Sequence, residues 1–119
     1  MSCKVYQPID YKVEEDTILN PDLLIVCKPI IKHFLDFAPD LVVEILSPAT
    51  ALKDRHTKFE IYQQQKIPYY IIVDVDKKYV EVFHLSENKY DPVLIEQNEP
   101  LAFTLTGCSF RVIFENIWS

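Results

Sequence analysis

The chain has 119 residues, a formal net charge of −6 and 49% hydrophobic residues, which fits one folded domain spanning residues 1–119 and not a disordered segment. The sequence contains one glycine, Gly107, and this excludes glycine-rich phosphate-binding and dinucleotide-binding loops, which need several glycines for close backbone approach. The acidic charge balance argues against a uniformly basic nucleic-acid-binding surface, although it leaves room for a local basic patch.

The first half of the chain predicts two buried strands separated by a loop. Residues 1–20 are polar and carry an acidic run, 14–16, that is typical of a solvated turn. Residues 21–27 are apolar after an initial Pro-Asp pair and predict a buried strand. Residues 28–39 predict a loop with a helical turn, and residues 41–46, also preceded by Pro-Asp, predict the second buried strand.

The second half predicts one helix followed by further strands. After Ser47-Pro48, residues 50–65 lack proline and glycine and are rich in helix formers, so they predict a helix capped by Ser47 or Thr50. Ile67-Pro68 ends it. The predicted strands that follow, separated by short polar turns, are residues 69–74, 79–85, 91–96 and 110–114. A central sheet with one helix after the second core strand indicates an α/β or α+β fold.

Neither the N-terminus nor the cysteines indicate export. Residues 1–10 lack the apolar stretch of a signal peptide, and no run approaches the roughly 18 apolar residues of a membrane span. We therefore expect a cytoplasmic protein with no membrane segment. Cys3, Cys27 and Cys108 form no CxxC pair, so a zinc ribbon or thioredoxin-type motif is not expected. The sequence predicts three reduced thiols, with Cys27 as a small core residue.

Glu44 is the strongest anomaly, because it lies in an otherwise apolar strand. The period of two places it on the same face as Val42 and Leu46. An ionised carboxylate without a partner is very unfavourable there, so a partner or a sheet edge must accommodate it. A structural ion pair with Lys or Arg and a role as metal ligand or catalytic acid are both open interpretations.

Asp22 and three residues of the predicted helix provide further candidates. Asp22 begins the preceding strand and would share a cleft with Glu44 if the two strands are neighbours; otherwise it is a turn aspartate after proline. Two carboxylates with waters and a phosphate make a Mg²⁺ site.

Asp54, Lys58 and Tyr62 share one helix face, and the simpler interpretation of Asp54 and Lys58 is a surface pair. Leu52 and Phe59 lie on another face, which we expect to contact the sheet. Without flanking glycines, Ser47 does not indicate a hydrolase nucleophile, and it is a helix cap or a hydroxyl lining the cleft.

Taken together, these segments resemble the Uma-type endonuclease family of the PD-(D/E)xK nuclease superfamily. The resemblance extends over about residues 5–114, and its most specific part is residues 39–48, PDLVVEILSP, with the Asp-Lys-Tyr helix that follows. It implies a restriction-endonuclease-like fold with a central mixed sheet. It also implies hydrolysis of DNA phosphodiester bonds that depends on Mg²⁺ or Mn²⁺.

The resemblance assigns roles to individual residues. Asp22 matches the PD aspartate and Glu44 the acidic residue of the (D/E)xK strand, so these two are the expected metal ligands. Leu46 occupies the usual lysine position. Lys58 from the helix is expected to supply that lysine as the third catalytic residue. Asp54 and Tyr62 match the accompanying helix positions, and with Ser47 they are possible accessory residues.

The resemblance also implies a longer N-terminal region with a helix, an early acidic residue and a hairpin, which this chain is expected to lack. A shortened sheet would leave open edges and apolar surface that a homodimer can cover. Two functions therefore remain: a metal-dependent endonuclease acting on DNA, or a catalytically inactive nuclease-like module that acts through homo-oligomeric contacts.

Overall fold

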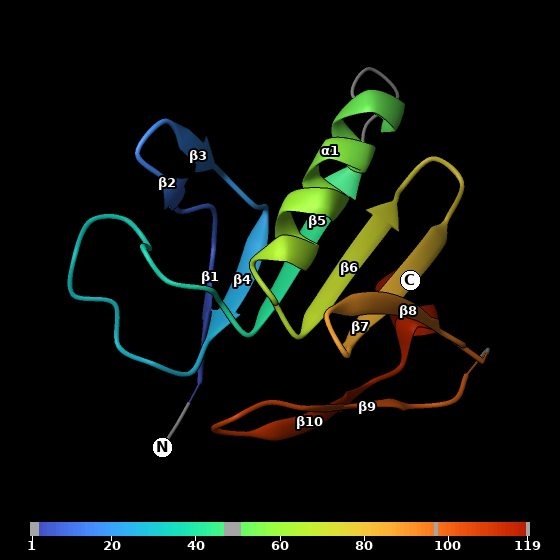
Figure 1. Cartoon of the computed structure of the whole chain (residues 1–119). Coiled ribbons are helices and arrows are strands. Elements are labelled where there is room, and N and C mark those ends of the chain that lie inside the picture. The colour runs from blue at the N-terminus through green and yellow to red at the C-terminus, as the bar shows by residue number, and fades with distance from the viewer. Residues whose placement is uncertain (1–2, 47–50, 97, 119) are drawn as a thin grey trace.

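The computed structural model describes residues 3–46, 51–96 and 98–118, without the side chains of residues 51–54, and forms a three-layered arrangement (Figure 1). The strands are β1 (Lys4–Tyr6), β2 (Tyr11–Glu14), β3 (Thr17–Leu19), β4 (Leu23–Val26), β5 (Leu41–Leu46), β6 (Tyr69–Asp74), β7 (Tyr79–Ser86), β8 (Lys89–Val93), β9 (Leu101–Thr104) and β10 (Ser109–Val112), and the helices are α1 (Ala51–Gln64) and the 3-10 helix η1 (Phe114–Trp118).

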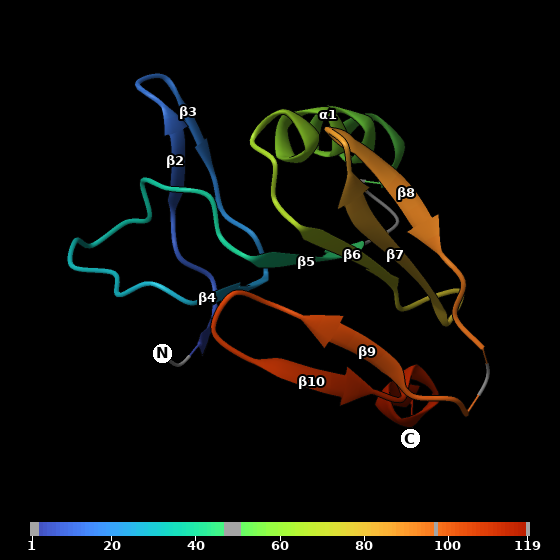
Figure 2. The same cartoon turned by 60° about the horizontal axis from the view of Figure 1, so that its bottom comes forward.

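The central layer is a six-stranded mixed sheet in the order β1-β4-β5-β6-β7-β8. Only β5 and β6 run parallel within it, and α1 makes the crossover that a parallel connection requires. Figure 2 shows α1 on one side of this sheet and the β9–β10 hairpin on the other. The predicted class, a central mixed sheet with a helix after the second core strand, is confirmed.

Successive side chains of β5 point to opposite faces of the sheet and so contribute to two separate core clusters. Val42 is fully buried on the face that α1 covers, whereas Leu41 is buried on the opposite face. Glu44 shares the face of Val42, as the period of two predicted. The acidic side chain therefore points toward the helix and not toward the β9–β10 hairpin.

Helix α1 contacts the sheet through a wider face than the sequence predicted. Tyr62 is fully buried and meets the ring of Tyr70 on β6 edge-to-face, with centroids 5.0 Å apart. Phe59 contacts Phe83 and Tyr90 in the same way, at 5.1 and 5.3 Å. Both residues belong to the docked face.

In the part of the chain that the structure describes, no helix has the length and apolar character needed to cross a membrane.

The chain turns sharply without using glycine. Two residues beyond the end of helix α1, Lys66 has a φ of 58°, in the left-handed region that glycine usually occupies. The Ile67 N–H then donates to the carbonyl of Tyr62. The hairpin turn between β7 and β8 uses Glu87 and Asn88 in the same region, with φ of 50° and 76°. A sequence with one glycine therefore still forms tight turns.

The N-terminal region contains more structure than expected. Strand β1 pairs antiparallel with β4, and β2 and β3 form a hairpin, so the expectation that this chain lacks an N-terminal hairpin is wrong. The predicted helical turn within residues 28–39 is also wrong. Leu35 instead forms a bridge to the N-terminal segment, where its N–H donates to Asp10 O and its carbonyl accepts from Lys12 N, both at 2.8 Å. Backbone pairing with a distant strand replaces the local helical hydrogen bonds.

Tyr11 predicts an alkaline loss of stability. It is 1% exposed, and burial raises the pKa of its phenol to about 12 from the ordinary 10.0. The folded state thus retains a proton that the unfolded state loses, so the free energy of unfolding falls as pH rises from 10 toward 12. We expect about 1.4 kcal/mol of this loss at pH 11, measured by urea unfolding. Tyr11→Phe should remove that part of the slope, and an identical slope in both proteins would contradict the assignment.

Candidate functional site

Glu44 is buried and both of its carboxylate oxygens have donors. It is 5% exposed and is the one charged side chain buried in the core among the described residues. Lys58 Nζ lies 2.6 Å from Oε2, and the Tyr62 hydroxyl donates to Oε1 over 3.1 Å. The residues Lys58 and Tyr62 are one helical turn apart on α1, so a single face of the helix reaches both oxygens.

Asp22 is brought beside Glu44 by the antiparallel pairing of β4 and β5. Leu23 lies opposite Val43, which places Asp22 opposite Glu44 one step further along the register. Asp22 Oδ2 accepts a 2.7 Å hydrogen bond from the N–H of Ile45, the residue after Glu44. This bond ties the start of β4 to the end of β5. The structure therefore brings together Asp22, Glu44 and Lys58, the three predicted site residues.

The electrostatics of Glu44 are set by opposing effects. Burial raises the pKa of its carboxyl group, and the hydrogen bond and positive charge of Lys58 lower it. The negative charge of Asp22, a smaller effect, raises the pKa further. Burial, with the nearby charge of Glu44, raises the pKa of Tyr62 far above its ordinary value. Tyr62 therefore stays protonated and acts as a donor to Glu44.

Among the side chains that the structure describes, one of the three accessory candidates, Ser47, Asp54 and Tyr62, is in contact with Glu44. Tyr62 contacts Glu44 directly and is part of the cluster. Ser47 lies outside the described residues, and so does the side chain of Asp54, although Asp54 falls within α1. Lys58 is not a surface residue paired only on the helix exterior. Its side chain is 21% exposed and bonds the buried carboxylate of Glu44.

Arg55 is a neighbouring residue that sequence reasoning missed. It forms an ion pair with Glu81 on β7, and both side chains are largely covered. This pair fixes the helix against the far half of the sheet, next to the turn that carries Lys58. No sequence signal could have revealed it, because Arg55 and Glu81 are joined only by the packing of α1 across β7.

The fold and these side chains define a mixed α/β protein with two carboxylates and a lysine at one end of a parallel strand pair. The chain belongs to the Uma2 family, whose model, described as "Putative restriction endonuclease", matches residues 2–112. The fold is similar to a crystal structure from Anabaena variabilis ATCC 29413, described as "a putative nuclease belonging to DUF820", with a TM-score of 0.74. The two chains are 13% identical, and the match covers 98% of this chain and 68% of the other. A comparison with curated proteins finds no match.

Proposed function

We propose that this protein is a metal-dependent endonuclease that hydrolyses DNA phosphodiester bonds, as a member of the PD-(D/E)xK superfamily. One observation carries the proposal: the buried carboxylate of Glu44 lies beside Asp22 and is hydrogen-bonded to Lys58. Such a cluster is costly for a fold to maintain, and perturbed carboxylates of this kind concentrate at functional sites. Membership of the Uma2 family supports the same chemistry.

The donor set fits a hard divalent cation. Asp22 and Glu44 supply carboxylate oxygens, which Mg²⁺ and Mn²⁺ prefer over sulfur or nitrogen ligands. The negative charge of Asp22 raises the pKa of Glu44, and a divalent cation bound between the two carboxylates would relieve this repulsion. Asp22 and Glu44 would therefore hold the ion. When bound, it would polarise the scissile phosphate and lower the pKa of an attacking water.

The helix residues would serve this reaction by orientation and charge. Lys58 Nζ, which is held against Glu44 Oε2, would orient the attacking water or stabilise the negative charge that develops on the phosphate. Tyr62 would keep Glu44 in place by donating to its other oxygen. The net charge of −6 implies that DNA binding relies on local contacts and not on a general positive field.

Asp22→Asn tests this proposal. We expect wild-type protein to cleave DNA with Mg²⁺ or Mn²⁺ and to bind Mn²⁺ in calorimetry, and the variant to lose both, because asparagine removes one of the two anionic ligands. Asparagine keeps an oxygen that can accept the Ile45 N–H, so the fold should survive. Asp91→Asn, at an exposed position of strand β8, is the matched control. Wild-type protein that neither binds Mn²⁺ nor cuts DNA would overturn the proposal.

The second candidate function is a catalytically inactive module that acts through a homodimer. It is favoured by the open edge strand β1, where Val5 is 66% exposed. The opposite edge, β8, contains Pro92, which has no N–H to donate to a further strand. An open edge pairs readily with another chain, so dimerisation through β1 remains a prediction under both functions. Absence of metal binding together with a stable dimer would favour this candidate.

A further inference from the structure

Three cysteines from distant parts of the chain meet on the sheet face opposite to Glu44. Their Sγ atoms all lie within 4.8 Å of one another. Cys3 precedes β1, Cys27 follows β4, and Cys108 lies in the turn of the β9–β10 hairpin. Cys3 and Cys27 are joined as a disulfide and Cys108 is a free thiol, so the predicted three reduced thiols are wrong for Cys3 and Cys27. The predicted burial of Cys27 is confirmed, at 2% exposure.

The register of the sheet explains why the first two sulfurs meet. Lys4 lies opposite Val26 in the antiparallel pair β1–β4, so the next step along both strands places Cys3 opposite Cys27. Directly opposed side chains in an antiparallel pair have Cβ atoms about 4.5–5.5 Å apart. Two thiols at these positions face each other whether or not they are oxidised.

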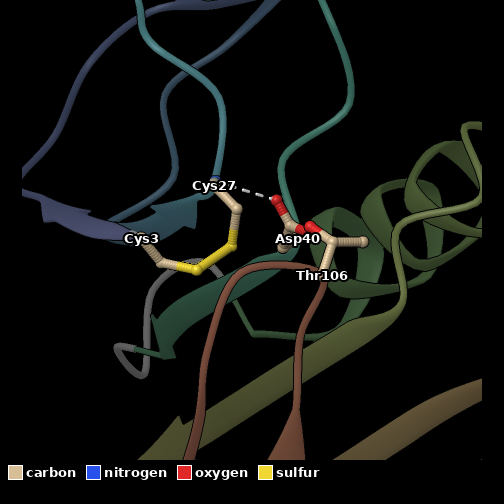
Figure 3. Close-up of a disulfide and its surroundings, with 4 residues drawn as sticks. All are labelled: Cys3, Cys27, Asp40 and Thr106. Carbon is tan, nitrogen blue, oxygen red and sulfur yellow. Dashed lines mark hydrogen bonds between the residues drawn. A yellow bond between two sulfur atoms is a disulfide. The ribbon is translucent and has the colours of Figure 1, made fainter. Parts of the chain in front are cut away.

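A separate hydrogen-bond bridge holds the hairpin tip that carries the third sulfur. Asp40 Oδ1 accepts from the Cys27 N–H over 3.1 Å, and Asp40 Oδ2 accepts from the Thr106 hydroxyl over 2.9 Å (Figure 3). Thr106 is two residues from Cys108, and the Cys108 carbonyl closes the turn by accepting from Leu105 N at 2.8 Å. The position of Cys108 is therefore fixed by Asp40 and by backbone contacts, independently of any bond between sulfurs.

We propose that in the reduced protein Cys3, Cys27 and Cys108 bind a thiophilic d¹⁰ metal ion, Zn²⁺ or Cu⁺, through three thiolates. The Cys3–Cys27 disulfide is the oxidised, metal-free form of the same site. Thiolates select these soft ions, and a metal–sulfur bond of about 2.3 Å places ligating sulfurs about 3.8–4.0 Å apart. The 4.8 Å limit on the three Sγ separations means that only small side-chain movements separate the present arrangement from that geometry. Cu⁺ is satisfied by three sulfurs, whereas Zn²⁺ would add a water.

The change between the two forms balances with a dithiol as reductant. The dithiol gives two electrons and two protons to the Cys3–Cys27 bond, which breaks into two thiols, and the reductant closes to its own disulfide. Metal binding then displaces the protons of the three thiols, which pass to solvent. A small-molecule disulfide as oxidant reverses the process: it takes one electron from each of two thiolates and, with two protons from solvent, becomes two thiols, while the Cys3–Cys27 disulfide forms and the ion leaves.

This site is distinct from the proposed nuclease centre in position and chemistry. Cys27 belongs to the core cluster that contains Phe103, whereas Glu44 faces α1 on the other side of the sheet. Sulfur ligands favour soft ions, and the carboxylates of Asp22 and Glu44 favour hard ones. The three-cysteine site can therefore be tested by a signal that only sulfur ligation produces, regardless of the outcome for the nuclease.

The test uses the full chain, reduced with a dithiol and then desalted under argon. Zn²⁺ and Cu⁺ are titrated separately against chromophoric chelators, and thiol alkylation is followed by mass spectrometry. We expect about one tightly bound ion, protection of all three cysteines from alkylation, and no such binding by the oxidised chain. Cys108→Ser should weaken binding at least about 100-fold, since loss of even an outer-shell partner of a metal site costs about 10–100-fold.

Ser109→Ala, an exposed neighbour in the same hairpin, is the control and should bind as wild type. Equal affinity of reduced wild type and Cys108→Ser, or three cysteines that stay fully reactive with metal present, would overturn the proposal. Circular dichroism reports whether reduction unfolds the chain. If it does, the ion should restore the fold, and a chain that stays unfolded with metal would also overturn it. The two titrations identify which ion the site prefers.

Discussion

Glu44→Gln is expected to eliminate metal-dependent DNA cleavage, with a loss of at least about 10²–10³-fold, the range found when one preorganised electrostatic group is removed from an active site. Glutamine retains the shape of the side chain and an oxygen that can accept from Tyr62, but it lacks the negative charge a divalent ion requires. The rate of cleavage of supercoiled plasmid with Mn²⁺ measures the effect.

The fold should tolerate this change, because burial already disfavours the ionised form of Glu44, as its raised pKa shows. A neutral side chain removes that penalty and gives up the ionic part of the Lys58 contact. Urea unfolding should thus give a small change beside a large loss of activity. Glu60→Gln, on the exposed side of the same helix, is the matched control and should cleave as wild type. Activity of Glu44→Gln within tenfold of wild type would place the catalytic metal elsewhere.

Phe103→Ala should cause the largest loss of stability, about 3–5 kcal/mol by urea unfolding, as is typical for a buried phenylalanine. Phe103 on β9 is fully buried between the hairpin and the central sheet. Its ring meets Tyr69 edge-to-face at 5.0 Å, stacks with Phe110 at 5.3 Å and contacts Phe114 at 6.2 Å. The substitution leaves a cavity that the surrounding rings cannot close.

Leu94→Ala provides the comparison, because Leu94 is 78% exposed and its truncation should change stability by no more than about 0.5 kcal/mol. If Phe103→Ala is too unstable to purify, Phe103→Leu should give an intermediate loss, since leucine fills part of the volume. A Phe103→Ala loss no greater than that of Leu94→Ala would show that the β9–β10 hairpin contributes little to the core.

The sequence predicted the centre of the molecule well, because local signals and burial agree there. Residues 41–46 and 69–74 are runs of mostly apolar residues, and the structure places β5 and β6 at those positions. The predicted helix at 50–65 corresponds to α1. Strand β9 and the 3-10 helix η1 were missed; both are short, although the burial of β9 does alternate, and η1 contains one buried residue, Phe114.

The candidate site was likewise predicted in part from residue type and completed only by packing and strand register. Residue type alone singled out Glu44, because a carboxylate within an apolar strand demands a partner. The residues alone did not identify that partner. The packing of α1 on β5 brings Lys58 and Tyr62 into hydrogen-bond contact with Glu44. Asp22 by itself was only a weak indication of a metal site, and the β4–β5 register is what places it beside Glu44.

The sequence by itself determined the strands and helix of the centre, the exclusion of glycine-rich phosphate loops and the position of the anomalous acid, because these depend on residues that are neighbours along the chain. The tertiary structure alone decided the pairing of Arg55 with Glu81 and the meeting of Cys3, Cys27 and Cys108. These contacts join residues far apart in sequence, and their positions follow from strand register and helix docking, which leave no trace in local composition.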